Sequence, residues 1–280
     1  MKLLTKKYWN LKRHPFFYYV RYILLSRNHH EKNAENIGCL NDINNIEDVP
    51  ALYFEVNTQI NVTPKMGTFE KALEIGAFLR NTIKGGPGLG LSSDKTLEKM
   101  LAGNGGVCSD FSQIFNLFCF INSIKVKEWG CVDRLYDSRF GHAFNEIYST
   151  EHQKWIAIDI HKGIYFTAVD GKPLSTIELF KNLRNGKELQ FTFISDYQPN
   201  DMRRIHSVYS KSTLPFVISN YKNKENDYFL NKYHDVFPSF LINFMLILLR
   251  KNHNFVFVMD NYKVKLLPKS IQSMKLIATE

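Results

Sequence analysis

Cysteine is scarce in this sequence, with four residues among 280, at positions 39, 108, 119 and 131. No two of them have the CxxC spacing that is typical of zinc or redox sites. Four dispersed thiols also do not form the dense disulfide framework of small secreted domains. Cys119 lies eleven residues beyond Cys108, about 16 Å along a helix axis and too far for a disulfide. The pattern therefore predicts reduced thiols in a cytoplasmic protein.

Acidic residues are absent from positions 1–30, which hold seven of the 36 Lys and Arg residues behind the net charge of +9. Arg21 interrupts the apolar run there and no small-residue cleavage site follows, so no signal peptide is predicted. One interpretation is an interfacial anchor in residues 1–27, a peripheral membrane contact with anionic lipid. The favoured alternative is a helix docked on the protein with its basic face in solvent. The apolar stripe of this helix consists of Phe16, Val20, Ile23 and Leu24. The basic residues that would meet the lipid are Lys6, Lys7, Lys12 and Arg13.

Long hydrophobic runs and nucleotide-binding motifs are also missing. The apolar run 237–249 has thirteen residues, fewer than the roughly 20 needed to span a bilayer, so a buried core helix is expected. The glycine-rich stretch at 85–93 has neither the GxGxxG spacing nor a following GKS or GKT, which excludes a phosphate-binding loop. No nucleic-acid-binding motif is present, which makes nucleic acid an unfavoured partner.

The run from Gly103 to Asp159 carries the candidate chemistry. An apolar face at helical spacing follows Cys108, so a helix is expected to begin there after the glycine turn at 103–106. A thiol at a helix N-terminus faces unpaired backbone N–H groups and the positive end of the helix dipole, and its pKa falls. The same N–H groups can hold an oxyanion. The apolar face consists of Val107, Phe111, Ile114, Phe115, Phe118 and Ile121.

A predicted β-hairpin supplies the partners for this thiol. The runs HAFNEIY and KWIAIDI are separated by a polar turn at 149–152. A fold about Thr150 and Glu151 places His142 opposite Asp159 and Glu146 opposite Trp155, all on one face. Asp159 can then orient His142. A slip of one residue would place the two on opposite faces.

The order of these motifs resembles the core of the transglutaminase-like superfamily, whose fold is related to the papain-like cysteine proteases. That resemblance covers about residues 67–166 and implies an α+β fold, with the Cys helix packed on an antiparallel sheet that bears His and Asp. It implies Cys108 as nucleophile, His142 as general acid and base, and Asp159 as the orienting carboxylate. The family's usual Trp is replaced by Phe144, and the Pro that often follows the Asp by Ile160.

Three segments are expected: a basic and aromatic extension with an irregular wrapping segment at 1–66, a transglutaminase-like core at 67–170, and a C-terminal α+β extension at 171–280. Predicted elements include helices at 69–83 and 94–101, the second capped by Asp94. A strand is expected at 125–135. Ser175 and Glu178 form a capping box for a helix that ends near Gly186, and residues 255–266 resemble a terminal hairpin.

Further residues are candidates for the cleft around the triad. Asn104 and Gln113 could donate to an oxyanion. The alternative for Asn104 is that it only shapes the turn, and Gln113 lies a helical turn or more inside the helix. Arg134 and Arg139, in the loop before His142, would favour an acidic substrate group; the simpler interpretation is ordinary surface charge.

These residues favour a cysteine acyltransferase or amidohydrolase that works through a thioester intermediate and needs no cofactor. Water would complete hydrolysis and an amine would complete transfer, and both alternatives stay open. The substrate is expected to carry an amide or amine, on a peptide or on a bacterial surface polysaccharide. The polysaccharide is considered because transglutaminase-like proteins also resemble enzymes of bacterial surface-polysaccharide biosynthesis. The alternatives are a zinc site that uses Cys108, His142, Asp159 or His161, and a catalytically silent module that binds an anionic polymer or a membrane.

Overall fold

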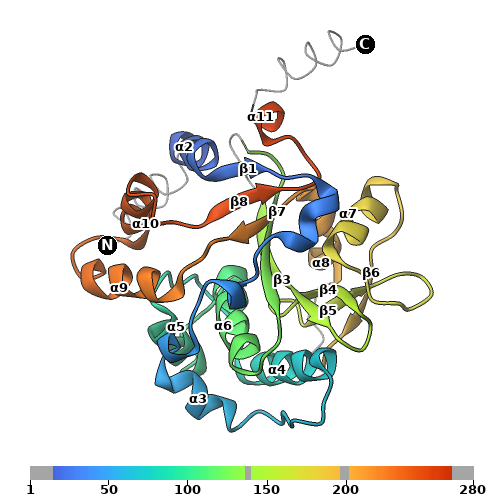
Figure 1. Cartoon of the computed structure of the whole chain (residues 1–280), viewed down its shortest axis with the longest axis horizontal. Coiled ribbons are helices and arrows are strands. Elements are labelled where there is room, and N and C mark those ends of the chain that lie inside the picture. The colour runs from blue at the N-terminus through green and yellow to red at the C-terminus, as the bar shows by residue number, and fades with distance from the viewer. Residues whose placement is uncertain (1–14, 136–139, 196–201, 267–280) are drawn as a thin grey trace.

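The computed structural model describes residues 15–135, 140–195 and 202–266. Figure 1 shows a mixed α+β structure built on one eight-stranded sheet with strand order β1-β8-β7-β2-β3-β4-β5-β6. The pair β1–β8 is parallel, and the other neighbours are antiparallel. The α+β class predicted from the sequence is confirmed at this level. The strands are β1 (Ser26–Asn28), β2 (Val126–Val132), β3 (Gly141–Ser149), β4 (Lys154–Asp159), β5 (Ile164–Thr167), β6 (Gln190–Phe193), β7 (Leu214–Ser219) and β8 (Asn254–Phe257).

One face of the sheet is covered by helices from the first half of the chain: α3 (Ala51–Asn57), α4 (Thr68–Thr82), α5 (Ser93–Leu101) and α6 (Cys108–Ile121). The predicted apolar face of α6 is buried at Phe111, Ile114, Phe115 and Phe118, which pack in one core with Ile147 of β3. Burial of these rings is the main force that fixes α6, and with it Cys108, against the sheet.

Two predictions about this face need correction. Helix α5 begins at Ser93 with Ser92 as its N-cap, so Asp94 lies in the first turn and is not the cap. The wrapping segment is more regular than expected, because it contains α3 and the short 3₁₀ helices η1 (Glu31–Asn36), η2 (Leu40–Asp42) and η3 (Ile46–Asp48).

The opposite face is covered by α7 (Thr176–Arg184) and α8 (Met202–Lys211). The predicted capping box is present: the Ser175 hydroxyl accepts from the Glu178 N–H, and the Glu178 carboxylate accepts from the Ser175 N–H at 2.7 Å. Phe144, Phe166 and Tyr209 meet under these helices with edge-to-face ring contacts. Phe144 therefore fills a core position between the sheet and these helices.

The remaining helices lie beside β7 and β8: α2 (Pro15–Leu25), α9 (Asn223–Tyr233), α10 (Ser239–Leu248) and α11 (Tyr262–Lys265). The predicted terminal hairpin is wrong, because 255–257 lie in β8, which pairs with β7 and β1, whereas the second half forms α11. The helix expected at 237–249 is present but is buried on one side only. Helix α2 buries Tyr22 and Leu25, while Ile23 and Leu24 of the predicted stripe are exposed.

The three predicted segments contribute strands to the same sheet: β1 from the first, β2–β5 from the second, and β6–β8 from the third. The division at 66 and 170 stays a prediction. In the described ranges, no helix combines the length and the hydropathy that a membrane crossing requires.

Candidate active site

Cys108 is the first residue of α6, as predicted, and the turn before it is held by a second glycine-rich segment. Gly86 donates its N–H to the Gly106 carbonyl at 2.9 Å, and Gly106 donates to the Pro87 carbonyl at 2.9 Å. A Cβ on Gly105 would lie 2.6 Å from the Pro87 oxygen, and its φ of +129° also favours glycine. The two loops can approach this closely only because a glycine stands at each contact.

The first turn of α6 is fixed by Asp110, whose carboxylate accepts from the Val107 N–H at 2.9 Å and from the Leu89 N–H at 3.2 Å. One side chain thus caps the helix and ties it to the loop 85–91. Cys108 itself is partly exposed. This arrangement presents the thiol at the end of the helix whose N–H groups have no intrahelical acceptor.

His142 and Asp159 come together from β3 and β4, but in a register two residues from the predicted one. Glu146 pairs with Ala157, where the prediction placed Trp155, and Ser149 pairs with Lys154. The turn occupies 150–153, with Gln153 at a φ of +51°, and is anchored by Glu151, which accepts from the Phe69 N–H of α4 at 2.8 Å. Because the shift is even, both side chains keep the predicted face.

His142 Nε2 lies 2.7 Å from Asp159 Oδ2. The same carboxylate oxygen accepts from the Tyr209 hydroxyl of α8 at 2.8 Å, and Oδ1 accepts from the Lys162 N–H at 3.0 Å. Asp159 is fully buried. Burial alone would raise the pKa of this carboxyl, but the His142 charge and the donated hydrogen bonds outweigh it and lower the pKa to about 2. The residue is therefore a fixed anion behind the imidazole.

Cys108 and His142 each shift the pKa of the other toward the charged form. Burial raises the pKa of the Cys108 thiol, yet the charge of His142, its hydrogen bond and the N–H of Ala143 together lower it below its usual range. Burial lowers the pKa of His142, but the negative charges of Asp159 and Cys108 raise it to about 10. Since Nε2 faces Asp159, Nδ1 is left for the thiol. The site favours a thiolate–imidazolium pair, in which the Cys108 sulfur is already charged.

His161 is the nearest further titratable group, with its ring centre 5.8 Å from that of His142. Burial lowers its pKa to about 3, so it is a neutral imidazole. One ligand atom each from His142, Asp159 and His161 lie within 4.8 Å of one another, and Cys108 does not belong to this group. Two of these atoms are already joined by the 2.7 Å hydrogen bond, and a metal between them would have to replace it.

The other candidate residues lie in different places. Asn104 is exposed and donates to the Ala102 carbonyl at 3.4 Å, which places it within its own turn. Gln113 donates to the Tyr221 hydroxyl at 3.0 Å and lines a cavity. Arg134 pairs with Asp133 at 3.3 Å, and Arg139 lies outside the described residues.

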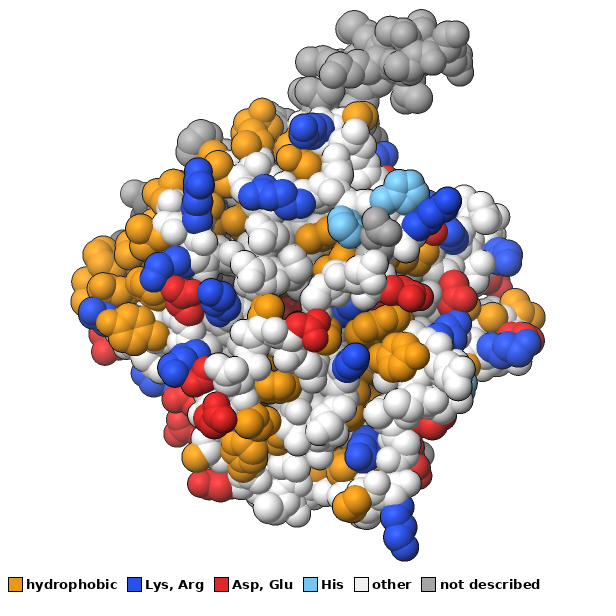
Figure 2. All heavy atoms as spheres, viewed as in Figure 1, with side chains coloured by type: hydrophobic (Ala, Val, Ile, Leu, Met, Phe, Trp, Pro, Cys, Tyr) orange, Lys and Arg blue, Asp and Glu red, His pale blue; other side chains and the backbone are white. Residues whose placement is uncertain are grey.

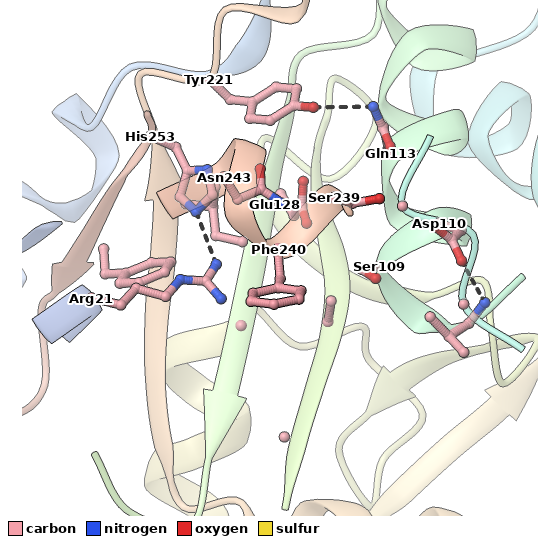
Figure 3. Close-up of a pocket in the computed structure, with 18 of the residues that line it drawn as sticks. Arg21, Ser109, Asp110, Gln113, Glu128, Tyr221, Ser239, Phe240, Asn243 and His253 are labelled. Atoms are coloured by element: carbon pink, nitrogen blue, oxygen red, sulfur yellow. Dashed lines mark hydrogen bonds between the residues drawn. The ribbon is translucent and has the colours of Figure 1, made fainter. Parts of the chain in front are cut away.

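A cavity of about 450 Å³ opens beside His142. Figure 3 shows residues of α2, α6, β2, α10 and β8 around it. Its walls include Leu89, Ser109 and Phe240 of α10, but Cys108 is not among its lining residues. The volume falls in the range of small-molecule sites. The glycine-rich stretch that the sequence excluded as a phosphate-binding loop therefore forms one wall of this cavity.

Two residues near the candidate site, Tyr209 and Glu128, are not predicted from the sequence. Tyr209 lies 50 positions after Asp159, in a helix whose packing on the sheet has no local sequence signal. Glu128 lies in a strand that was recognised only by its apolar residues, and its side chain lines the cavity. A charged residue in an otherwise apolar strand is the signal that could have identified it.

No protein-family profile matches the chain, and no curated protein sequence matches it. Among solved structures, a proposed cysteine protease from Cytophaga hutchinsonii is similar at 21% sequence identity and a TM-score of 0.30. The similarity covers 42% of this chain and 38% of that protein.

Proposed function

We propose that the protein is a cysteine enzyme that cleaves or transfers acyl groups through a thioester on Cys108. The observation that carries this proposal is the buried contact of 2.7 Å between Asp159 and His142, beside a thiol whose pKa His142 lowers. A buried carboxylate, an imidazole and a thiol at a helix start form the minimal arrangement for nucleophilic catalysis by cysteine.

In the proposed reaction, the Cys108 thiolate attacks the acyl carbon, and the backbone N–H of Cys108 stabilises the oxyanion. His142 then gives its proton to the leaving amine, and a thioester remains. His142 next removes a proton from water or from an acceptor amine, which attacks the thioester and restores the thiolate. Asp159 keeps the imidazole ring oriented through both steps, and Tyr209 holds Asp159.

The same proposal includes the type of bond and the class of substrate. The transglutaminase-like order of the Cys, His and Asp motifs supports amide chemistry on a peptide or on an amine- or carboxylate-bearing polysaccharide. Mass spectrometry of candidate glycans and peptides incubated with the protein and with amines would identify such a substrate by its change in mass.

Acylation by p-nitrophenyl acetate tests the nucleophile without knowledge of the natural substrate. The wild-type protein is expected to release nitrophenolate in a burst close to one equivalent, and peptide mapping is expected to find the acetyl group on Cys108. The burst should disappear in Cys108→Ala and persist in Cys119→Ala, which removes a buried thiol of the same helix. A burst that survives Cys108→Ala, or none in the wild type, would contradict the proposal and favour a catalytically silent binding module.

A second role, contact with an anionic membrane, is favoured by one surface feature. Figure 2 shows hydrophobic side chains gathered at the left edge of the molecule, over α9 and α10. Exposed large hydrophobic residues of α2, α9, α10 and the α9–α10 turn form this apolar patch: Tyr19, Ile23, Leu24, Tyr228, Val236, Phe237, Leu248 and Leu249. Arg250 and Lys251 follow directly. Apolar side chains bordered by cations are typical of interfacial binding.

Sedimentation with liposomes tests this role. The double variant Leu248→Ser/Leu249→Ser is expected to bind vesicles that contain phosphatidylserine at least about fivefold more weakly, because these side chains are 60% and 55% exposed and lose their insertion energy. Val169→Ser is the control, since Val169 is 89% exposed outside the patch. Equal sedimentation of all three proteins would remove the membrane role. Deletion of residues 1–27 is a poorer test, because Tyr22 and Leu25 are buried in the core.

A further inference from the structure

The cavity beside His142 contains two opposite charges that are not paired with each other. Glu128 enters it from β2 and Arg21 from α2, and both lie among its lining residues. Figure 3 shows Arg21, Glu128 and Phe240 around the same space. The floor between them is formed by small residues on adjacent strands, Gly130 of β2 paired with Ala143 of β3. The ring of Phe216 packs over Gly130, where an added Cβ would lie 2.5 Å from it, so Gly130 makes room for this ring in the cavity wall.

Glu128 accepts few hydrogen bonds for a partly buried carboxylate. Asn116 of α6 donates to Oε2 at 3.1 Å, and Asn145 donates to Asn116 at 2.8 Å, which fixes the Asn116 amide. Within the described residues, no lysine or arginine lies within ion-pair distance of Glu128. Burial raises the pKa of this carboxyl to about 7, while Asn116 and the more distant Arg21 lower it only partly. A cation at the free oxygen would remove this penalty.

The Arg21 guanidinium is held in place by two contacts, and neither of them supplies a negative charge. Its guanidinium contacts His253 Nε2 at 3.4 Å and lies 4.8 Å over the Phe255 ring. Burial and the Arg21 charge lower the pKa of His253 to about 3, so His253 is neutral and accepts this hydrogen bond. Arg21 has five N–H donors, and the remaining ones can bind an anion. No carboxylate of the described residues forms an ion pair with it.

We propose that this cavity binds a free zwitterion of amino-acid size, with its ammonium on Glu128 and its carboxylate on Arg21. The alkyl part would lie against the Phe240 and Phe244 rings of α10. The inference goes beyond the proposed function: His142 is among the lining residues of this cavity, whereas Cys108 is not.

Isothermal titration calorimetry on Cys108→Ala, which cannot form the thioester, tests binding alone. The probes are 6-aminohexanoate, hexylamine and hexanoate, together with glycine and 4-aminobutanoate for the spacing of the charges. At least one zwitterion is expected to bind at least tenfold more tightly than hexylamine or hexanoate. Hexanoate or hexylamine as the best ligand, or no binding of any zwitterion, would overturn the proposal.

Glu128→Gln in the same background separates charge from shape. The Gln amide oxygen can still accept from Asn116, while the negative charge is lost. Binding of the best zwitterion is expected to weaken at least tenfold in Glu128→Gln, and to be unchanged in Glu55→Gln, which alters an exposed acid on α3. Unchanged affinity in Glu128→Gln would overturn the assignment. Should Glu128→Gln fail to fold, Glu128→Asp keeps the charge and should retain the preference for the zwitterion over hexanoate; loss of that preference would also count against the proposal.

The two proposals can fail separately. The p-nitrophenyl acetate burst depends on Cys108 and is expected to persist in Glu128→Gln. A normal burst without zwitterion binding removes the assigned ligand and leaves the cysteine chemistry intact. Zwitterion binding that depends on Glu128, in a protein without any burst, removes the chemistry and leaves a ligand site.

Discussion

Replacement of His142 by alanine is expected to slow alkylation of Cys108 by iodoacetamide at pH 6 by at least about tenfold. Burial raises the pKa of the thiol, and the charge and hydrogen bond of His142 are the main causes that lower it. Without His142, burial and the Asp159 charge still raise the pKa, and only the smaller effect of the Ala143 N–H still lowers it. Each unit of pKa increase lowers the thiolate fraction about tenfold at a pH below it, and the greater nucleophilicity of a more basic thiolate recovers about half of that on a logarithmic scale.

The measurement is a pH profile of alkylation, mapped peptide by peptide. Cys39, Cys119 and Cys131 are internal controls, because all three are buried and burial raises the pKa of each thiol. His161→Ala is the matched variant, since it removes a neighbouring neutral imidazole that is not among the main causes of the shift in the pKa of Cys108. A profile that is the same in wild type and His142→Ala would show that the thiol is not activated by the imidazole.

Replacement of Asp159 by asparagine is expected to destabilise the protein by about 3 kcal/mol at pH 6, because it removes the larger of the two negative charges that stabilise the buried imidazolium and leaves only the Cys108 thiolate. The folded-state pKa of Asp159 is lowered from 3.8 to about 2, so its contribution is present above pH 3.8 and is lost as the pH falls through 2. The pKa of His142 is raised from 6.5 to about 10, so its contribution is present below pH 6.5 and is lost as the pH rises through 10. The cost of the substitution should therefore be largest between about pH 4 and 6.5.

Urea denaturation of wild type and Asp159→Asn at several pH values measures this effect. Tyr209→Phe is the control for geometry: it removes one hydrogen bond to Asp159 and keeps the charge, so a loss of about 1 kcal/mol is expected. Equal losses in the two variants, or a loss in Asp159→Asn that does not change with pH, would mean that Asp159 acts only as a hydrogen-bond partner.

Local sequence signals were sufficient for the elements that carry the candidate site. The start of α6 at Cys108 follows from three glycines and the apolar spacing behind them, because both act within a few residues. The capping box at Ser175 and Glu178 was recognisable for the same reason. The hairpin register was predicted two residues away from the observed one, since the conformation of Gln153 and the contact of Glu151 with α4 depend on distant chain segments.

In the C-terminal third, local sequence signals were not sufficient to predict the structure. An alternating apolar run at 255–266 resembled a hairpin, but parallel pairing with β1, a strand more than 200 positions earlier, takes its first part into the sheet. The apolar run of α10 was expected in the core, yet it packs on α2 and α9 at the surface and closes the cavity with Phe240 and Phe244. Composition indicated burial in both cases but contained no information on the partner.

The sequence by itself determined where the thiol, the imidazole and the carboxylate lie along the chain, and that the first begins a helix while the others lie on paired strands. Only the tertiary structure decided that Tyr209 supports Asp159, and that Arg21 and Glu128 face one cavity beside His142. Helix starts, caps and strand alternation arise from interactions over a few residues. Charges from α2 and β2 meet only when a sheet assembled from the whole chain brings them together.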